Sequence, residues 1–233
     1  MRNVKMLIIL DLDDTLIDTS GYYLPLKLRQ ALDAMINSGL ETGDKKEEQL
    51  FQALLQIDTS SPNGRETIKS FLTQYSAGNN SRLFEVGEEA YYGPCADEFK
   101  IPLLDHTNEV ISYLKQNGHI LVLVTYGMKS EQHKKILTSG IRKELFDQII
   151  IVDFTEGYDK GHVYKKLLME YGLSEKEIVV CGDKYSSDIL PAKKLGLKTV
   201  HFRHGRGKNH RYNPNEVDYS IENIIKLKEI VEN

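Results

Sequence analysis

Several features are scarce in this 233-residue chain. It has no tryptophan and only two cysteines, Cys95 and Cys181. The two thiols lie far apart and lack metal-ligand spacing, which argues against a disulfide framework and against a structural zinc site. We therefore expect both to be free thiols in a reducing compartment, which indicates the cytoplasm.

Long apolar runs and a strong charge of one sign are also missing. No run approaches the ~20 residues needed to span a bilayer, and the apolar N-terminal run ends without a small-residue cleavage site. The net charge of −4 gives no reason to expect nucleic acid as a partner. With 40% hydrophobic residues, the chain is typical of a globular protein that does not enter a membrane.

What the chain does have is a dense cluster of carboxylates near its start. The apolar run that begins at Met6 ends at Asp11, Asp13 and Asp14, three aspartates within four positions. Neighbouring carboxylates repel one another, and burying an unpaired carboxylate is costly. We therefore expect cations from elsewhere in the chain, or a bound metal ion, to compensate.

The pattern along the chain predicts an α/β fold. Short apolar runs of the kind found in buried strands occupy residues 4–10, 120–125, 148–152, 177–182 and 197–202. Helical segments are expected at 130–141 (Ser130 as cap), 161–173, 186–197 (Ser187 as cap) and, through the tail, from 220 to 233. This alternation favours a Rossmann-like parallel sheet covered by helices.

The gap between the first two strands reads as an all-helical insertion. Its helices are predicted at 23–39, 44–58, 61–75 (Ser61 as cap, Pro62 at the first helical position) and 81–93. We expect a catalytic core formed by residues 1–17 and 101–233 and a helical cap domain at 18–100. The cap would follow the carboxyl end of the first strand, where ligands bind in open α/β sheets.

Polar residues follow four of the predicted strands. They are Asp11 with Asp13, then Thr125, then Lys160, then Asp183 with Asp188. Because the carboxyl ends of parallel strands converge on one rim, these side chains should share one site. Hard cations such as Mg²⁺ prefer oxygen ligands of this kind.

These residues, in this order, resemble the four motifs of the haloacid dehalogenase superfamily of phosphohydrolases. The resemblance covers the core, whereas the insertion matches in position and helical character only. It implies that Asp11 is the nucleophile and forms an aspartyl-phosphate. It implies that Asp13 is the general acid and base, and that its backbone carbonyl binds the metal.

The resemblance assigns the remaining motifs to phosphoryl and metal binding. Thr125 would donate its hydroxyl to a phosphoryl oxygen, and Lys160 would neutralise charge there and orient Asp11. Asp183 and Asp188 would hold Mg²⁺, either directly or through a bound water.

The expected function is a Mg²⁺-dependent phosphatase acting on a small phosphorylated metabolite, with the insertion as a lid. Asp13 favours phosphate ester hydrolysis over dehalogenation, because an alkoxide leaving group needs a proton and a halide does not. A sugar-phosphate mutase of the same superfamily and a non-catalytic phospho-acceptor or binding protein remain alternatives. A phosphonate-cleaving enzyme would need a Schiff-base lysine in an apolar setting, and none of the insertion's candidates indicates one: Lys27, Lys45, Lys46 and Lys69.

Some assignments stay open at this point. Gly161 follows Lys160 where many members have proline, so Lys165, Lys166 and Lys184 remain alternatives for the third motif. Asp14 is expected to cap the turn after the strand, and Asp18 either borders the site or caps the first inserted helix.

For some of the remaining side chains the sequence allows two interpretations, and for others it allows one. Tyr126 either narrows the pocket or packs, and Cys181 is expected in the core. The basic segment 201–212 is expected to be a solvated loop, or else to attract an anionic substrate. His106, His119 and His133 show no ligand spacing and are expected at the surface.

Overall fold

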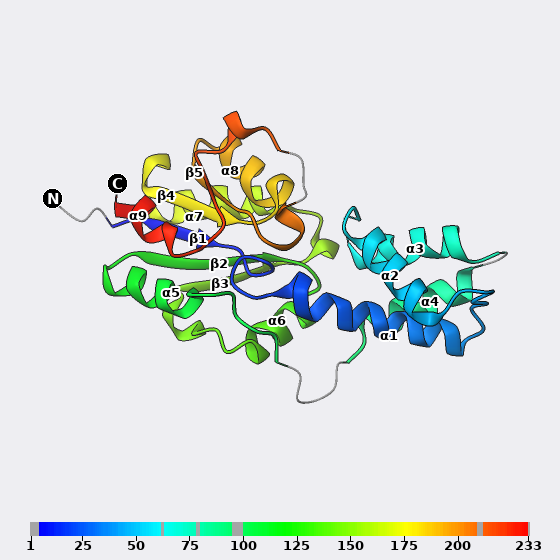
Figure 1. Cartoon of the computed structure of the whole chain (residues 1–233). Helices are drawn as coiled ribbons and strands as arrows, with labels where there is room; N and C mark the ends of the chain where they lie inside the picture. The colour runs from blue at the N-terminus through cyan, green and yellow to red at the C-terminus, as the bar shows by residue number, and fades with distance from the viewer. Residues whose placement is uncertain (1–4, 62, 78–79, 95–99, 209–211, 233) are drawn as a thin grey trace. The chain divides into compact units, whose positions relative to one another are not determined.

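The structure, a computed structural model, describes the chain except residues 1–4, 62, 78–79, 95–99, 209–211 and 233 (Figure 1). Cys95 and Pro62 therefore lie outside the described residues. The chain divides into two compact units. One comprises Met1–Thr19 with Lys100–Asn233, and the other comprises Ser20–Phe99.

The first unit contains a six-stranded parallel sheet in the order β3-β2-β1-β4-β5-β6 (Figure 1). Its strands are β1 (Leu7–Leu10), β2 (Ile120–Tyr126), β3 (Gln148–Val152), β4 (Ile178–Gly182), β5 (Lys198–Phe202) and β6 (Tyr219–Ile221). The α/β prediction and the five predicted strands are confirmed. β1 lies between β2 and β4, with Leu10 opposite Leu123 on one side and Cys181 on the other.

The sixth strand corrects the prediction of a helix from residue 220. Tyr219–Ile221 instead pair with β5, and the helix α9 is confined to Lys226–Glu232. Asp218 fixes the entry into β6, because its carboxylate accepts hydrogen bonds from the backbone N–H and the hydroxyl of Thr199 at 2.9 and 2.8 Å. The helical spacing of apolar residues in the tail does not indicate that its first residues pair with β5.

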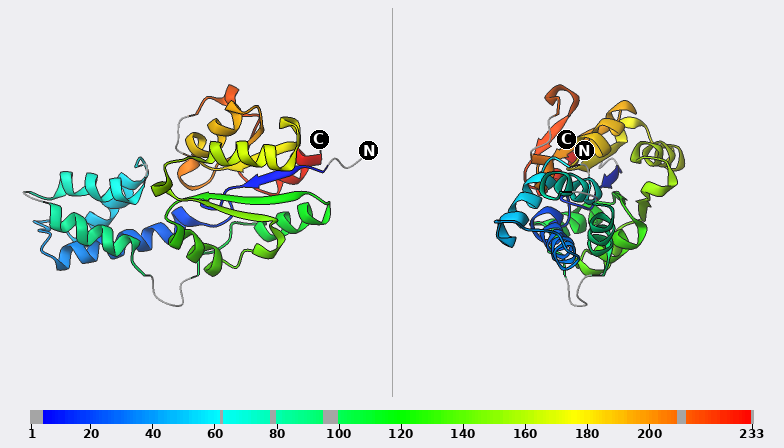
Figure 2. Two further views of the ribbon diagram at one scale, coloured as in Figure 1. Left: turned by 180° about the vertical axis from the view of Figure 1, so that it is seen from behind. Right: turned by 90° about the vertical axis from the view of Figure 1, so that its right-hand side faces the viewer.

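Four further helices belong to the same unit: α5 (Thr107–Gln116), α6 (Lys129–Thr138), α7 (Lys160–Tyr171) and α8 (Leu190–Lys194). α7 and α8 pack on the sheet face that contains Leu7 and Ile9, and α7 is seen most clearly from behind, in the left view of Figure 2. Short helical turns connect the elements at Lys143–Leu145, Phe154–Glu156, Glu175–Glu177, Tyr185–Ile189, Gly205–Lys208 and Pro214–Glu216.

Two predicted caps in this unit are wrong. α6 begins at Lys129 with Met128 at the N-cap position, and the Lys129 N–H is donated to the Asp153 carboxylate at 3.0 Å. Asp153, which follows β3, thus accepts a hydrogen bond at the start of α6 in the place expected for Ser130. Ser187 lies in the turn before α8 and does not cap it, because α8 begins at Leu190.

The second unit is helical, preceded by the turn Thr19–Tyr23 that leads out of the first. Its helices are α1 (Leu24–Asn37), α2 (Glu47–Asp58), α3 (Gly64–Tyr75) and α4 (Ser81–Tyr92). α1 packs against α4, and α3 packs against both α2 and α4. Asn63 caps α3 in place of Ser61, because its side chain accepts the Glu66 N–H at 3.0 Å.

Two side chains are buried, although the sequence indicated a surface position for His119 and no apolar setting for Lys27. His119 is 6% exposed and its Nδ1 accepts the Met6 N–H at 3.2 Å, so the expectation of a surface residue is wrong. Lys27 is fully buried within the second unit, where its ammonium group donates to the Gly93 carbonyl and lies over the Tyr23 ring. Among the described residues, no helix is long and apolar enough to cross a membrane.

We predict that Leu32→Ala lowers the free energy of unfolding by about 3 to 5 kcal/mol, because Leu32 is fully buried in the helical core of the second unit. Urea or thermal unfolding would measure this. Leu137→Ala removes the same atoms from a side chain that is 67% exposed and should change stability by less than about 0.5 kcal/mol. Equal losses in the two variants would contradict the assignment of this core.

Candidate active site

The backbone at the end of β1 places the side chains of Asp11 and Asp13 at the rim of the sheet. The Asp11 N–H donates to the Cys181 carbonyl at 3.0 Å, so sheet pairing continues one residue beyond the strand. Asp14 then adopts a left-handed backbone conformation (φ 54°), and its N–H donates to the Ile17 carbonyl at 2.9 Å. Aspartate tolerates this conformation better than most residues. The tight turn leaves Asp11 and Asp13 at the rim of the sheet, on a rigid loop.

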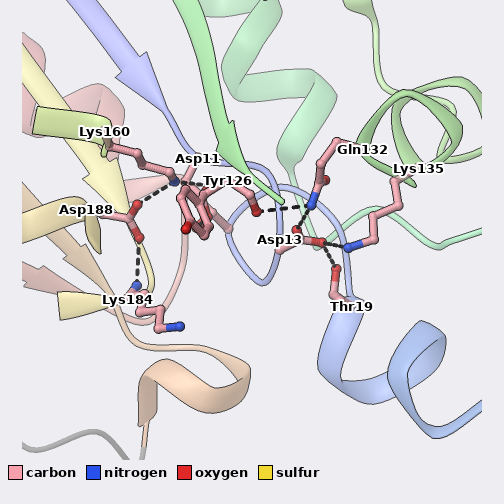
Figure 3. Close-up of polar contacts among 10 residues, drawn as sticks. Asp11, Asp13, Thr19, Tyr126, Gln132, Lys135, Lys160, Lys184 and Asp188 are labelled. Carbon is pink, nitrogen blue, oxygen red and sulfur yellow. Dashed lines mark hydrogen bonds and ion pairs between the residues drawn. The ribbon is translucent and has the colours of Figure 1, made fainter. Parts of the chain in front are cut away.

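Lys160 joins two of the predicted site residues. Its Nζ lies 2.5 Å from Asp11 Oδ1 and 2.5 Å from Asp188 Oδ1, and all three side chains are buried (Figure 3). Asp159 caps α7 by accepting the His162 N–H, which places Lys160 as the first helical residue. Burial alone would lower the pKa of Lys160, but Asp11 and Asp188 raise it well above its usual value. The ammonium group is therefore charged.

Three carboxylates converge on this lysine. Oxygen atoms of Asp11, Asp183 and Asp188 all lie within 4.8 Å of one another. Burial raises the pKa of Asp11 to about 7 against the pull of Lys160, and burial together with Asp11 and Asp188 raises the pKa of Asp183 well above its usual value. Three buried carboxylates facing one ammonium group are short of positive charge. This all-oxygen donor set fits a hard divalent cation.

Asp13 has a separate environment. Its carboxylate accepts hydrogen bonds from Thr19 Oγ1 at 2.5 Å, Gln132 Nε2 at 3.0 Å and Lys135 Nζ at 2.8 Å (Figure 3). Burial acts to raise the pKa of Asp13, but the ion pair with Lys135 and the three hydrogen bonds lower it below its usual value. The two aspartates of the first motif therefore have pKa values shifted in opposite directions.

Thr125 lies at the end of β2 and is fully buried. Its Oγ1 has no hydrogen-bond partner within the part of the chain that the structure describes. Buried hydroxyls are nearly always hydrogen-bonded, so this one is available to a ligand or a water molecule. Tyr126, the next residue, is 45% exposed, so simple packing within this unit does not explain it.

The structure separates Lys160 from its alternatives. Lys165 and Lys166 are exposed on α7. Lys184 is half-buried, and its backbone N–H donates to Asp188 Oδ2 at 2.9 Å. Lys160 is thus the lysine that the fold brings to Asp11. Its role in the reaction stays a prediction.

Asp14 and Asp18 lie together on the loop after β1. Their carboxylates and His204 are within 4.8 Å of one another, and His204 Nε2 lies 3.5 Å from Asp18 Oδ1. Asp18 directly precedes the helical turn Thr19–Tyr23, which runs into α1, and whether it caps the first inserted helix stays a prediction. Burial raises the pKa of the Cys181 thiol, which is in the core as expected.

The start of the basic segment 201–212, which lies at the end of β5 and just after it, contributes more than a solvated loop. His201 is fully buried and its Nε2 donates to the Asp183 carbonyl at 2.8 Å. A Cβ atom at Gly207 would lie 2.4 Å from the same carbonyl oxygen, so only glycine fits there. At Gly205, which has a left-handed backbone (φ 48°), a Cβ atom would lie 2.4 Å from the Asp14 carboxylate. Sequence reasoning missed this support for the loops of the first and fourth motifs.

Comparison with known proteins agrees with this geometry. Residues 5–196 match the model of the haloacid dehalogenase-like hydrolase family. The chain belongs to this family. It is 29% identical over 232 residues to a glyceraldehyde 3-phosphate phosphatase from Methanocaldococcus jannaschii, an alignment that covers 97% of this chain and 96% of the relative.

Solved structures have the same fold. A predicted phosphoglycolate phosphatase from Haemophilus somnus superposes with a TM-score of 0.74 at 20% identity, covering 97% of each chain. The magnesium-bound HAD-hydrolase YfnB from Bacillus subtilis gives a TM-score of 0.66 at 18% identity, covering 98% of this chain and 99% of that one. The predicted superfamily, the inserted helical region and the class of enzyme, a phosphatase of this family, are confirmed.

The charge shortage predicts a pH-dependent stability. In the metal-free protein the folded state holds the Asp11 proton more tightly than the unfolded state does, since the pKa of Asp11 is raised from 3.8 to about 7. Its contribution therefore makes stability fall as pH rises between these values. Asp11→Asn should flatten the fall of the thermal unfolding midpoint between about pH 5 and about pH 8, measured with a chelator. Parallel curves for the two proteins would contradict the shift.

We also predict that Gly182→Ala impairs the site. A Cβ atom at 182 would lie 2.6 Å from Cβ of Asp188, so Asp188 must shift from its place beside Lys160 or the strand must move. Metal affinity or activity should fall about ten- to a hundredfold. Gly118→Ala adds a Cβ that meets nothing within 4 Å at a left-handed position (φ 81°), so it should cost stability alone. Unchanged metal affinity and activity in Gly182→Ala would show that the site does not depend on the space that Gly182 leaves for Asp188.

Proposed function

We propose that the protein is a Mg²⁺-dependent phosphatase that hydrolyses a small phosphate monoester through an aspartyl-phosphate on Asp11. The observation that carries this proposal is the convergence of Asp11, Asp183 and Asp188 on Lys160 at the carboxyl ends of neighbouring strands. A bound Mg²⁺ would supply positive charge to the phosphoryl group and to Asp11. Asp11, Asp183, Asp188 and the backbone carbonyl of Asp13 are the proposed ligands.

In the proposed first step, the Asp11 carboxylate attacks phosphorus and the ester P–O bond breaks. Lys160, 2.5 Å from Asp11 Oδ1, orients the nucleophile and offsets the charge that the phosphoryl group brings. The buried Thr125 hydroxyl donates to a phosphoryl oxygen, which gives it the acceptor that it does not find among the described residues. The leaving oxygen takes a proton from Asp13, and the product alcohol departs.

In the proposed second step, Asp13 accepts a proton from water, which attacks phosphorus and restores the Asp11 carboxylate with release of phosphate. The lowered pKa of Asp13 favours the ionised form that this step uses. The first step requires the protonated form, so Asp13 must gain its proton when substrate is bound.

The relatives support a proposal for the substrate class. The chain is similar over nearly its whole length to glyceraldehyde 3-phosphate phosphatases, among them the Methanocaldococcus jannaschii enzyme. We therefore propose a small phosphorylated metabolite, with triose phosphates as the first candidates. The helical insertion would act as a lid that excludes water from the site.

The test is phosphate release from a panel of monoesters, with Mg²⁺ and with a chelator. The panel contains glyceraldehyde 3-phosphate, phosphoglycolate, a hexose phosphate and a nucleoside monophosphate. Release should require Mg²⁺, and Asp11→Asn should lower it roughly a thousandfold or more because the nucleophile is lost.

Asp105→Asn is the matched control, because it neutralises an exposed aspartate of the same unit. It should leave turnover unchanged. Substantial activity in Asp11→Asn would show that the nucleophile is misassigned. An isomerised product without phosphate release would favour the mutase instead.

A further inference from the structure

Three side chains donate to the Asp13 carboxylate, although its side chain is 25% exposed. Thr19, Gln132 and Lys135 all donate to it, and Lys135 also forms an ion pair with it (Figure 3). Each of the three donors is less than a tenth exposed. A buried lysine is rarely found without a partner, and Asp13 is a partner of Lys135 at 2.8 Å.

Gln132 and Lys135 come from one face of α6, three residues apart. The Gln132 amide lies so close to the chain after β2 that a Cβ atom at Gly127 would be 2.5 Å from its Nε2. The same Nε2 also donates to the Tyr126 carbonyl at 3.3 Å. The loop after β2 therefore fixes the amide that faces Asp13.

The two aspartates of the first motif are tied to different elements. Asp11 pairs with Lys160 at the start of α7, whereas Asp13 pairs with Lys135 on α6. Lys160 already serves Asp11 and Asp188, and Asp13 has a separate cation in Lys135. A group that moves a proton at the leaving oxygen must be held within hydrogen-bond reach of that oxygen.

We infer that Lys135 and Gln132 are positioning residues that hold the Asp13 carboxylate apart from the Asp11–Lys160–Asp188 cluster, so that Asp13 serves the leaving group and the attacking water. This inference rests on the proposed function. Neither residue contacts the substrate. They act on the reaction only through Asp13.

The inference predicts a dependence on the leaving group. An alkyl phosphate needs a proton on its leaving oxygen, whereas p-nitrophenolate leaves without one. In Lys135→Met, rapid-mixing measurements should show the first release of alcohol from an alkyl phosphate slowed about tenfold or more. The first release of p-nitrophenolate from p-nitrophenyl phosphate should stay within about twofold of the wild type, and KM for both substrates should stay within about twofold.

Three variants separate positioning from charge. Lys134→Met removes a neighbouring, half-buried charge from α6 and should behave as the wild type. Gln132→Met removes a donor but no charge and should show the same leaving-group pattern to a smaller extent. Lys135→Arg keeps a charged donor and should lie closer to the wild type than Lys135→Met does.

Several outcomes would overturn the inference. Equal slowing of both substrates would place the action of Lys135 on Asp11 or the phosphoryl group. A change in KM alone would make Lys135 a substrate-attracting charge, and unchanged rates would leave it without a role in the reaction.

Crystal structures of the wild type and of Lys135→Met decide the question independently of turnover. The Asp13 carboxylate should shift towards the Lys160 cluster in the variant, while an unmoved carboxylate would overturn the inference. Absence of hydrolysis by the wild type would overturn the proposed function instead, and the two crystal structures would still test the positioning of Asp13.

Discussion

The crowding of negative charge at the end of β1 is the constraint on which the site depends. Asp11 and Asp13 leave β1 two residues apart, and the adjacent β4 brings Asp183 and Asp188 to the same rim. Repulsion among carboxylates in a buried setting is costly unless cations share the space. The fold supplies two lysines from different helices, and these divide the carboxylates between two environments.

This division sets the chemistry that each aspartate can perform. Burial raises the pKa of Asp11 to about 7, whereas Lys135 and two further donors lower the pKa of Asp13 against its burial. Groups of one residue type whose pKa values are pushed apart are suited to different roles in one reaction. The cluster around Asp11 is short of positive charge and suited to a metal ion, while Asp13 already has its own cation.

Much of the fold could be predicted because apolar runs and turn residues are local signals. The five predicted strands and the helical insertion match the structure closely. Most of the failures share one cause, which is that the deciding partner is distant in sequence. Asp153 caps α6 from the end of β3, β6 exists only as a partner of β5, and the environments of His119 and Lys27 depend on packing.

The sequence by itself determined the family, the succession of the first five strands along the chain and the carboxylates that gather at the rim. These follow from short motifs placed directly after apolar strands, and the parallel topology then forces the strand ends together. Only the tertiary structure decided that Lys160, not Lys165 or Lys166, meets Asp11, and that Lys135 meets Asp13. Side chains more than a hundred residues apart are paired by how α6 and α7 pack against the sheet, and no local pattern in the sequence encodes that packing.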